Sequence, residues 1–305
     1  MKGSASVTMH ERSPFSSVYE FIIEKTVLLC GLASIIFVLL IFTFLLKEGL
    51  RAFAAVSPAD FLLGRQWYPI STPPKFGILP LIAGTFVVTF GATVLSVPFG
   101  IASAFYIAEV AGPRLRNILK TSIELLAAIP SVVIGFIGMV TVAPFLARLF
   151  DLPTGQTALA GSVMLSLMAM PTIVSIAEDA ITAIPARYRE AALALGATRW
   201  EYMYRIAVRA AGPGIVAAVM LGIGRVIGET MAVMMITGNS AQIPHSLLQP
   251  VRTMTATIAA EMGETVPGGD HYAALFAIGL VLFIITFFVN LSADFFLHRE
   301  RGRLG

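Results

Sequence analysis

An arginine and a glutamate stand close together inside a stretch that is otherwise apolar. Arg225 and Glu229 lie within the run from Gly214 to Ile236. A charge at the centre of a membrane helix costs roughly 2.5 to 3.5 kcal/mol on insertion scales, so Arg225 needs a partner or water. Because a guanidinium fork binds the oxygens of an oxyanion in a bidentate manner, Arg225 is a candidate for an anion pathway. Glu229 would then hold the Arg225 side chain in the empty pathway and keep the anion from binding too tightly.

An ion pair that only fixes helix packing is the plainer interpretation of these two residues. On a continuous helix Glu229 lies one turn beyond Arg225, about 6 Å along the axis. Such a pair, with the arginine first, contributes only about 0.2 to 0.5 kcal/mol, which does not offset the desolvation of two charges. Gly224 and Gly228 form a GxxxG pair beside the charges, and this spacing allows another helix to approach closely. We therefore expect the charges to lie in a polar cavity at a subunit interface.

A stripe of hydroxyl residues in another apolar run offers further polar groups. Thr85, Thr89 and Thr93 recur every four residues, so they share one helix face and are candidates for donating to a passing anion. The alternative, in which the threonines bond the carbonyls of their own helix, is more frequent and is favoured. Pro130 followed by Ser131 predicts a kink whose freed carbonyl faces the cavity, and Ser131 joins the candidate pathway residues.

The residue pattern gives no support for metal, redox or nucleotide chemistry. Cys30 is the only cysteine, and the four histidines are scattered, with no HExxH pair that would indicate a zinc enzyme. The sequence contains no GxxxxGK[ST] loop, so the chain cannot hydrolyse ATP by itself. We expect no catalytic residue, no metal site and no cofactor bound by this chain.

The candidate residues must be positioned by helices that cross a lipid bilayer. The chain has 305 residues, of which 57% are hydrophobic and only 13% are charged, whereas soluble domains carry about a quarter charged residues. We predict an all-α, polytopic membrane protein with six transmembrane helices, and the first is too long to be a cleaved secretory signal. The six apolar runs are Thr26 to Leu46, Ile78 to Ile107, Ile123 to Val142, Ala158 to Ala177, Gly214 to Ile236 and Ala273 to Phe296.

The charge distribution predicts the orientation and accounts for the net charge of +3 without a nucleic-acid partner. With the N-terminus inside, fourteen of the 21 lysines and arginines fall on the inner face and six on the outer face. This asymmetry follows the positive-inside rule, so both termini are predicted to be cytoplasmic. On the inner side, Lys120 and Glu124 are predicted to form an interfacial ion pair.

The connections between the runs define the domain organisation. The external stretch from Val251 to Glu264 is helix-like, and it is predicted either to meet a soluble partner or to act as a lid. We expect, in order, a cytoplasmic segment 1–25, an accessory first transmembrane helix 26–46, an external loop 47–77, a main transmembrane domain 78–296 with a cytoplasmic loop 178–213, and a cytoplasmic tail 297–305.

The cytoplasmic loop 178–213 has the signals of a helical hairpin. Pro185 fits a helix start and Gly196 fits the cap at the end of that helix. Thr198 and Glu201 have the spacing of a capping box, which begins a second helix. Because a small, apolar helix exposed to water attracts a covering protein, we expect the first helix to dock on a cytoplasmic partner. A simple return of the chain to the membrane is the alternative.

Within this loop the stretch EAALALGATRWEYMYRI resembles the EAA loop of ABC importer permeases. The residues that match the family pattern are Glu190, Ala191, Ala192, Gly196 and Ile206. The resemblance implies that the first short helix docks in a groove of a cytoplasmic ATPase and transmits its movement. Where the family pattern continues with Leu-Pro, this chain has Val208-Arg209, a departure that leaves the docking helix intact.

The resemblance extends from about Gly77 to Phe296 and is most specific to permeases of the phosphate importer, of the PstC type rather than the PstA type. It rests on GTFVVTFGATVLSVPFGIASAFYIAEV, LLAAIPSVVIGFIGMV and GRVIGETMAVMMITGN. It implies a type I (MetI-like) permease fold in the cell inner membrane and the import of inorganic phosphate. The implied partners are a second, PstA-type permease, an ATPase dimer that holds ATP and Mg²⁺, and an external phosphate-binding protein.

Three other functions fit parts of the pattern. Another oxyanion, such as sulfate or molybdate, would use the same fold. A secondary transporter with Glu229 as a proton carrier would need no ATPase. A membrane scaffold would use the docking helix but would leave the charges of the apolar run unexplained.

Overall fold

A computed structural model describes the backbone of residues 14–301 and the side chains of residues 20–292. Helices dominate this part of the chain, and its two named strands, β1 (Trp67–Tyr68) and β2 (Lys75–Phe76), form a short antiparallel hairpin. The chain divides into two compact units, residues 1–47 and 48–305. The described part of the first unit belongs to one long helix, α1 (Pro14–Arg51), whose apolar side chains are mostly exposed.

Five helical stretches are long and apolar enough to cross a membrane, and a bent pair of helices provides one more. The pair, Arg199–Ala210 and Gly212–Gly228, is bent by 70°. The prediction of six spans is confirmed for the described chain when this pair counts as one span. The predicted boundaries differ at every span, most of all at the third and the fifth. The five single stretches are Glu20–Ala54, Leu79–Val110, Ser131–Leu149, Ala158–Thr182 and Asp270–Ser292.

The boundaries predicted for the third span, 123–142, are wrong. Helix α4 (Pro113–Ala127) ends shortly before Pro130, and the span begins at Ser131, which is half-buried. Proline has no N–H to donate, and it disfavours helical backbone in the residue before it, so the helix breaks there as the predicted kink requires. The span consists of α5 (Ser131–Ile137), the π-helical turn η3 (Gly138–Val142) and α6 (Ala143–Leu149).

The predicted fifth span, 214–236, is two helices rather than one. Helix α11 (Gly212–Gly228) ends at a break, and helix α12 (Met231–Ile236) begins after it. Glu229 lies in the break with an extended backbone, φ −68° and ψ 131°. Apolar composition does not reveal this break, because both helices and the residues beside the break belong to one hydrophobic run.

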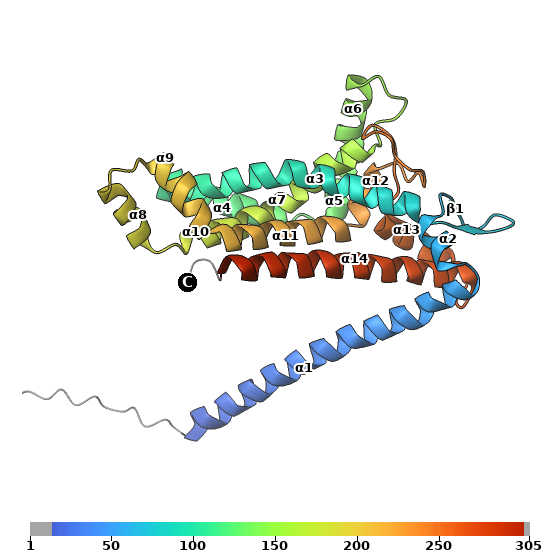
Figure 1. Ribbon diagram of the computed structural model, residues 1–305, viewed down its shortest axis with the longest axis horizontal. Helices are drawn as coiled ribbons and strands as arrows, with labels where there is room; N and C mark the ends of the chain where they lie inside the picture. The colour runs from blue at the N-terminus through green and yellow to red at the C-terminus, as the bar shows by residue number, and fades with distance from the viewer. Residues whose placement is uncertain (1–13, 302–305) are drawn as a thin grey trace, which may run out of the picture. The chain divides into compact units, whose positions relative to one another are not determined.

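Four long helices of the second unit run side by side (Figure 1). Glycines bring their backbones close together. A Cβ atom added at Gly100 or at Gly222 would lie 2.8 or 2.6 Å from side-chain carbons of Ile173, so these positions admit no larger residue without a shift of the neighbour. The four helices are α3 (Leu79–Phe105), α7 (Ala158–Thr182), α11 and α14 (Asp270–Arg301).

Short elements gather at the two ends of this bundle (Figure 1). One end, where α14 also finishes, carries α8 (Ala186–Ala194), α9 (Arg199–Glu201), the π-helical η4 (Tyr202–Ala207) and α10 (Val208–Ala210), beside the π-helical end of α3, η2 (Tyr106–Val110). The other end carries η1 (Ala52–Ala54), α2 (Pro58–Leu63), the strand hairpin, α13 (Met254–Glu261) and η5 (Met262–Glu264). The helix predicted within 251–264 is therefore confirmed.

Candidate functional site

Arg225 lies in the last turn of α11, on a face that the described chain leaves open. Its Nη1 lies 3.5 Å from Oγ1 of Thr172 on α7, a distance at the outer limit of a hydrogen bond. Leu221, one turn earlier on α11, is 56% exposed, and Gly228 is exposed too. A positive charge is thus presented on a largely apolar surface, where it requires water, an anion or another protein.

The sequence predicted that Glu229 lies one helical turn beyond Arg225, but α11 ends at Gly228 and Glu229 lies in the break after it. Its Oε1 accepts the N–H of Ala232 at 3.3 Å, which caps α12, and its carbonyl oxygen accepts the hydroxyl of Thr255 at 2.8 Å. Inside a membrane a helix break persists where neighbouring groups satisfy the freed backbone, as these two do. Within the described range 20–292, Arg225 and Glu229 do not form an ion pair with each other.

Gly224 and Gly228 meet no neighbour in the part of the chain that the structure describes. A Cβ atom added at either position would have no atom within 4 Å. The close approach that their spacing predicts is therefore not made by another helix of the described chain, and the glycine surface stays available to a second protein. It continues the open face on which Arg225 lies.

The threonine stripe of α3 is used for internal bonds. Thr85 is buried, and its hydroxyl donates to the carbonyl of Leu81 at 2.8 Å and accepts the N–H of Met254 at 3.0 Å. The hydroxyl of Thr93 donates to the carbonyl of Thr89 at 2.7 Å. Thr85 and Thr93 therefore follow the alternative that the sequence favoured, in which helix carbonyls accept the hydroxyls.

The predicted hairpin is present, with its capping residues in place. Helix α8 ends before Gly196, whose φ of +84° lies in the left-handed region that suits glycine. Thr198 and Glu201 form the predicted capping box: the N–H of Thr198 donates to Oε2 of Glu201 at 2.9 Å, and the N–H of Glu201 donates to Oγ1 of Thr198 at 3.2 Å. Local signals alone sufficed for this prediction.

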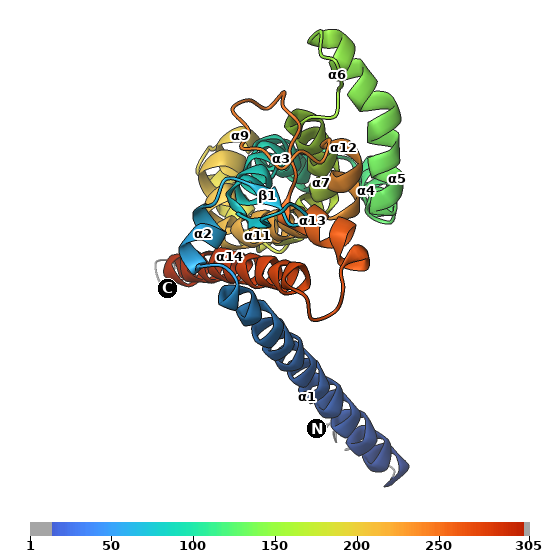
Figure 2. The ribbon, with the colours of Figure 1, turned by 90° about the vertical axis from the view of Figure 1, so that its right-hand side faces the viewer.

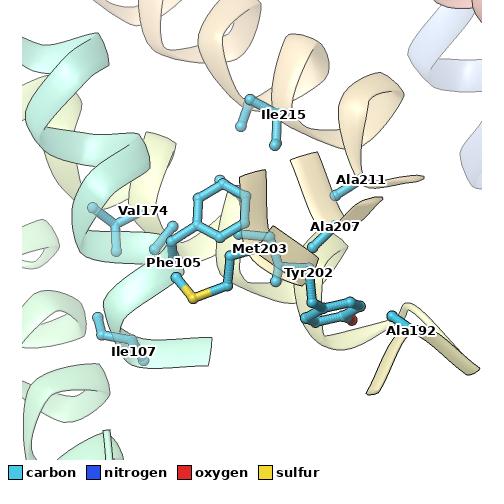
Figure 3. Packing of buried hydrophobic residues seen from close by; sticks show 13 residues of the cluster. Phe105, Ile107, Val174, Ala192, Tyr202, Met203, Ala207, Ala211 and Ile215 are labelled. Atoms are coloured by element: carbon cyan, nitrogen blue, oxygen red, sulfur yellow. The ribbon is translucent and has the colours of Figure 1, made fainter. Parts of the chain in front are cut away.

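Helix α8 buries one small residue and presents most of its other side chains outward. Ala192 is buried against a cluster that includes Tyr202 (Figure 3), whereas Glu190 and Ala191 are exposed. Leu195 is 89% exposed, and Leu193 and Tyr188 are exposed as well. An apolar surface of this kind next to water marks a site for a protein partner.

A buried carboxylate that the sequence did not single out lies near the end of α7. The Glu178 side chain is only 2% exposed, and its oxygens accept hydrogen bonds from Nη2 of Arg116 at 2.5 Å and from Nζ of Lys120 at 2.9 Å. Lys120 also contacts Asp179 at 3.1 Å. The predicted pairing of Lys120 with Glu124 is therefore wrong, because α4 turns Lys120 toward α7. The hydrogen bonds to Glu178 and Asp179 raise the pKa of Lys120, which keeps its ammonium charged.

A second ionic contact joins α8 to the end of α3. Nη1 of Arg189 lies 3.6 Å from a carboxylate oxygen of Glu109 in η2. The Arg189 side chain is 39% exposed, so this pair contributes little stability. It is a direct contact between α8 and the end of α3.

At the opposite end of the bundle, Glu261 joins three segments. It accepts hydrogen bonds from Nε1 of Trp67 at 3.1 Å and from Arg252 at 2.5 Å, and it pairs with His271 at 2.8 Å. These residues line a cavity of about 720 Å³ together with the loop 239–242. The partners are far apart in the sequence, so no local pattern indicated this cluster.

The sequence matches known transport proteins along most of its length. The family described as binding-protein-dependent transport system inner membrane component matches residues 96–302. A probable ABC transporter permease protein, YqgH, of Bacillus subtilis is 39% identical over 274 residues, which are 89% of each chain. The phosphate transport system permease protein PstC of Mesorhizobium japonicum is 36% identical over 266 residues, 81% of this chain and 80% of that protein.

The fold is also found in a solved transporter. A chain of the bacterial alginate ABC transporter, in complex with its alginate pentasaccharide-bound periplasmic protein, superposes with a TM-score of 0.63 and 17% identity. The match covers 92% of this chain and 97% of that one. At this identity the likeness concerns the fold alone, and it confirms the predicted importer-permease architecture.

Proposed function

This chain belongs to the family of inner membrane components of binding-protein-dependent transport systems, and we propose that the importer it serves carries inorganic phosphate. As a member of this family it is a multi-pass inner membrane protein and a permease subunit of an ABC importer. It is not catalytic, because separate ATPase subunits hydrolyse ATP in such systems.

The observation that carries the phosphate proposal is Arg225 on the open face of α11. Its guanidinium makes only a marginal contact with Thr172 and has no carboxylate partner among the described ion pairs, so it is available to a doubly charged oxyanion. The likeness to a PstC protein over most of both chains supports phosphate as that anion. Glu229, across the break, supplies the negative charge that helps the anion leave.

The pathway would lie between this chain and a second, PstA-type permease. Gly224 and Gly228 leave space beside Arg225, and a helix of the second permease would fill it. The charge would then face a polar cavity rather than lipid. Thr89 and Ser131, both half-buried, are proposed as further hydroxyl contacts. The hydroxyls of Thr85 and Thr93 are already used in hydrogen bonds within the chain.

The energy would come from an ATPase dimer that holds ATP and Mg²⁺ and docks on α8. Leu193, Leu195 and Tyr188 would pack in its groove, and Gly196 would set the angle of the helix. This places both termini of the chain, and the hairpin, in the cytoplasm. A phosphate-binding protein would meet the opposite end, where Glu261 joins three segments.

A second candidate substrate is another oxyanion, such as sulfate or molybdate, because the name of the Bacillus subtilis relative specifies no substrate and a guanidinium fork does not distinguish tetrahedral anions. A proton-coupled mechanism would place the proton on Glu229. Since that carboxylate already caps α12, we favour the ATP-driven mechanism.

The test is to reconstitute the whole complex in vesicles and to add its binding protein. Phosphate, sulfate and molybdate uptake would be measured with and without ATP, and with the proton gradient collapsed. We expect ATP-dependent uptake of phosphate alone, unaffected by an uncoupler. Uptake of sulfate or molybdate in preference to phosphate would overturn the substrate, and uptake that follows the proton gradient would overturn the mechanism.

A further inference from the structure

Within the described range 20–292, Glu178 is the one charged residue that is buried. It has no role in the anion pathway proposed above. Both of its cationic partners, Arg116 and Lys120, come from α4, and Thr182 donates a further hydrogen bond at 3.0 Å. No residue of α4 is buried. The hold of α4 on α7 therefore depends on these charged hydrogen bonds, which are stronger than neutral ones.

The position of Glu178 connects α4 with the docking helix. It lies in the last turns of α7, directly before the chain enters α8. Movement of α8 thus reaches Glu178 through a short stretch of backbone and reaches α4 through its two cations. Asp179, next in the chain, is 69% exposed and touches only Lys120 in this cluster, so it adds little to the hold.

Helix α11 is fastened to α7 by a different means, close apolar packing. Gly222 lies against Ile173 and Gly214 lies against Ala180, and Arg225 reaches Thr172. The inner parts of α4, α7 and α11 are therefore one packed group, attached to α8 at its end (Figure 1).

The outer continuations of these helices form another group. Helix α12 packs on α5 and α7 (Figure 2); a Cβ atom added at Gly135 would lie 2.8 Å from Cα of Ala232, and one added at Gly138 would lie 2.5 Å from Cδ1 of Ile236. Contacts this close leave little room for α5 and η3 to shift against α12.

Weak points of the backbone separate the inner group from the outer group. Helices α4 and α5 are divided at Pro130, and α11 and α12 at Glu229. Pro171 lies inside α7, next to the residue that Arg225 contacts, and a proline inside a helix removes one backbone hydrogen bond. Hinges are a few residues at element ends that absorb backbone changes.

We infer that Glu178 is a positioning residue that fastens α4 to the inner group. Movement of α8 then bends the permease at Pro130, Pro171 and Glu229. This bending changes the distance between Arg225 and Glu229. This inference rests on the proposed function, because it assigns the movement to the ATPase that docks on α8. Arg225 belongs to the inner group, whereas Glu229 caps the first helix turn of the outer group. Each cycle would therefore separate and reunite the two charges that bind and release the anion.

Two label pairs on a Cys30→Ala chain test the bending directly. Cysteines at Ile118 and at Ala183, which caps the end of α7, are both exposed and report distances within the inner group, and cysteines at Ala183 and Val133 report distances across the hinge. In the assembled complex, spin-label distances would be compared without nucleotide and with ATP trapped. We expect the first distance to stay constant and the second to shift. A second distance that does not shift, or a first distance that shifts as much, would overturn the inference.

Glu178→Gln and Lys120→Gln test the positioning role, with Asp179→Asn as the matched control. We expect both test variants to keep binding-protein-stimulated ATP hydrolysis. The amount of phosphate imported per ATP should fall, by on the order of tenfold for Glu178→Gln. Lys120→Arg, which keeps the positive charge, should retain the import ratio that Lys120→Gln loses. Should Glu178→Gln fail to assemble, Lys120→Gln decides, because Arg116 still holds Glu178. An unchanged ratio in an assembled variant sinks the inference. Failure of the proposed function would appear separately, because vesicles with the wild-type complex would then import no phosphate. The label distances are measured without substrate, so they test the bending independently.

Discussion

At the scale of single residues, the central feature is the guanidinium of Arg225 on an apolar helix face. Arg225 has only a marginal contact with Thr172, and desolvating an unpaired charge costs more than that contact returns. The charge is therefore stable only if water, phosphate or a second permease completes its surroundings. Glu229 caps α12 instead of neutralising Arg225, so under the proposed function a net attraction for anions would remain at the break.

Substitutions of Arg225 should affect transport more than assembly. Arg225→Ala removes the fork and leaves Glu229 to repel the anion, so we expect uptake to fall by two orders of magnitude or more, about 3 kcal/mol. Arg225→Lys keeps the charge but loses the bidentate geometry, so it should rescue in part. Uptake in reconstituted vesicles would be measured beside size-exclusion profiles. An assembled alanine variant with wild-type uptake would falsify the pathway role, and loss of assembly alone would favour a packing role.

Glu229→Gln separates charge from capping. The amide oxygen of glutamine still accepts the N–H of Ala232, so α12 keeps its cap and the complex should assemble normally. Without the negative charge, phosphate should dwell longer at Arg225 and the maximal uptake rate should fall several-fold. Initial rates over a range of phosphate concentrations test this. A variant with an unchanged maximal rate would show that Glu229 is only a cap.

At the scale of elements, Gly196 is expected to set the angle at which α8 meets the ATPase. Leucine in the left-handed region costs about 1–2 kcal/mol, so Gly196→Leu should shift α8 while the bundle remains intact. Binding-protein-stimulated ATP hydrolysis and phosphate uptake should fall together. Gly112→Leu is the matched control, because Gly112 has a negative φ and no atom near its added Cβ. If both activities stay normal in Gly196→Leu, the hairpin is only a connector.

Glu261 should stabilise the opposite end of the bundle. Glu261→Ala leaves the N–H groups of Trp67 and Arg252 and the ring of His271 without their acceptor, and Arg252 is only 22% exposed. We expect a loss of about 1–3 kcal/mol in unfolding free energy. Thermal unfolding of the purified protein in detergent measures it, with the exposed Glu264→Ala as the control. Equal melting temperatures for the two variants would contradict a structural role for the cluster.

The elements that the sequence predicted are those whose signals are local. The capping box of Thr198 and the left-handed Gly196 lie within a few residues of the helices they limit, so spacing alone identifies them. The break at Glu229 was missed because it depends on Thr255, which helix α13 brings to the break only after the chain folds. The clusters around Glu178 and Glu261 were missed for the same reason, since their partners meet only after the helices pack.

At the scale of the whole molecule, the distribution of lysine and arginine remains the basis for the orientation. Fourteen of the 21 fall on the face predicted to be cytoplasmic, and the structure places α8 and the end of α14 at the same end of the bundle (Figure 1). The orientation decides which end of the bundle can meet an ATPase and which can meet a binding protein.

Cysteine labelling in intact cells and in inverted vesicles tests this orientation. Cys30 is the only cysteine, so a Cys30→Ala chain gives an unlabelled background. Ile70 is 93% exposed in the strand hairpin and Val266 is 77% exposed beyond α13, and cysteines at these positions should react from outside with a reagent that does not cross membranes. A cysteine at the exposed Arg187 in α8 should react only in inverted vesicles. The reverse pattern would place α8 outside, where no ATPase can dock, and both the coupling role of Gly196 and the bending assigned to Glu178 would be lost with it.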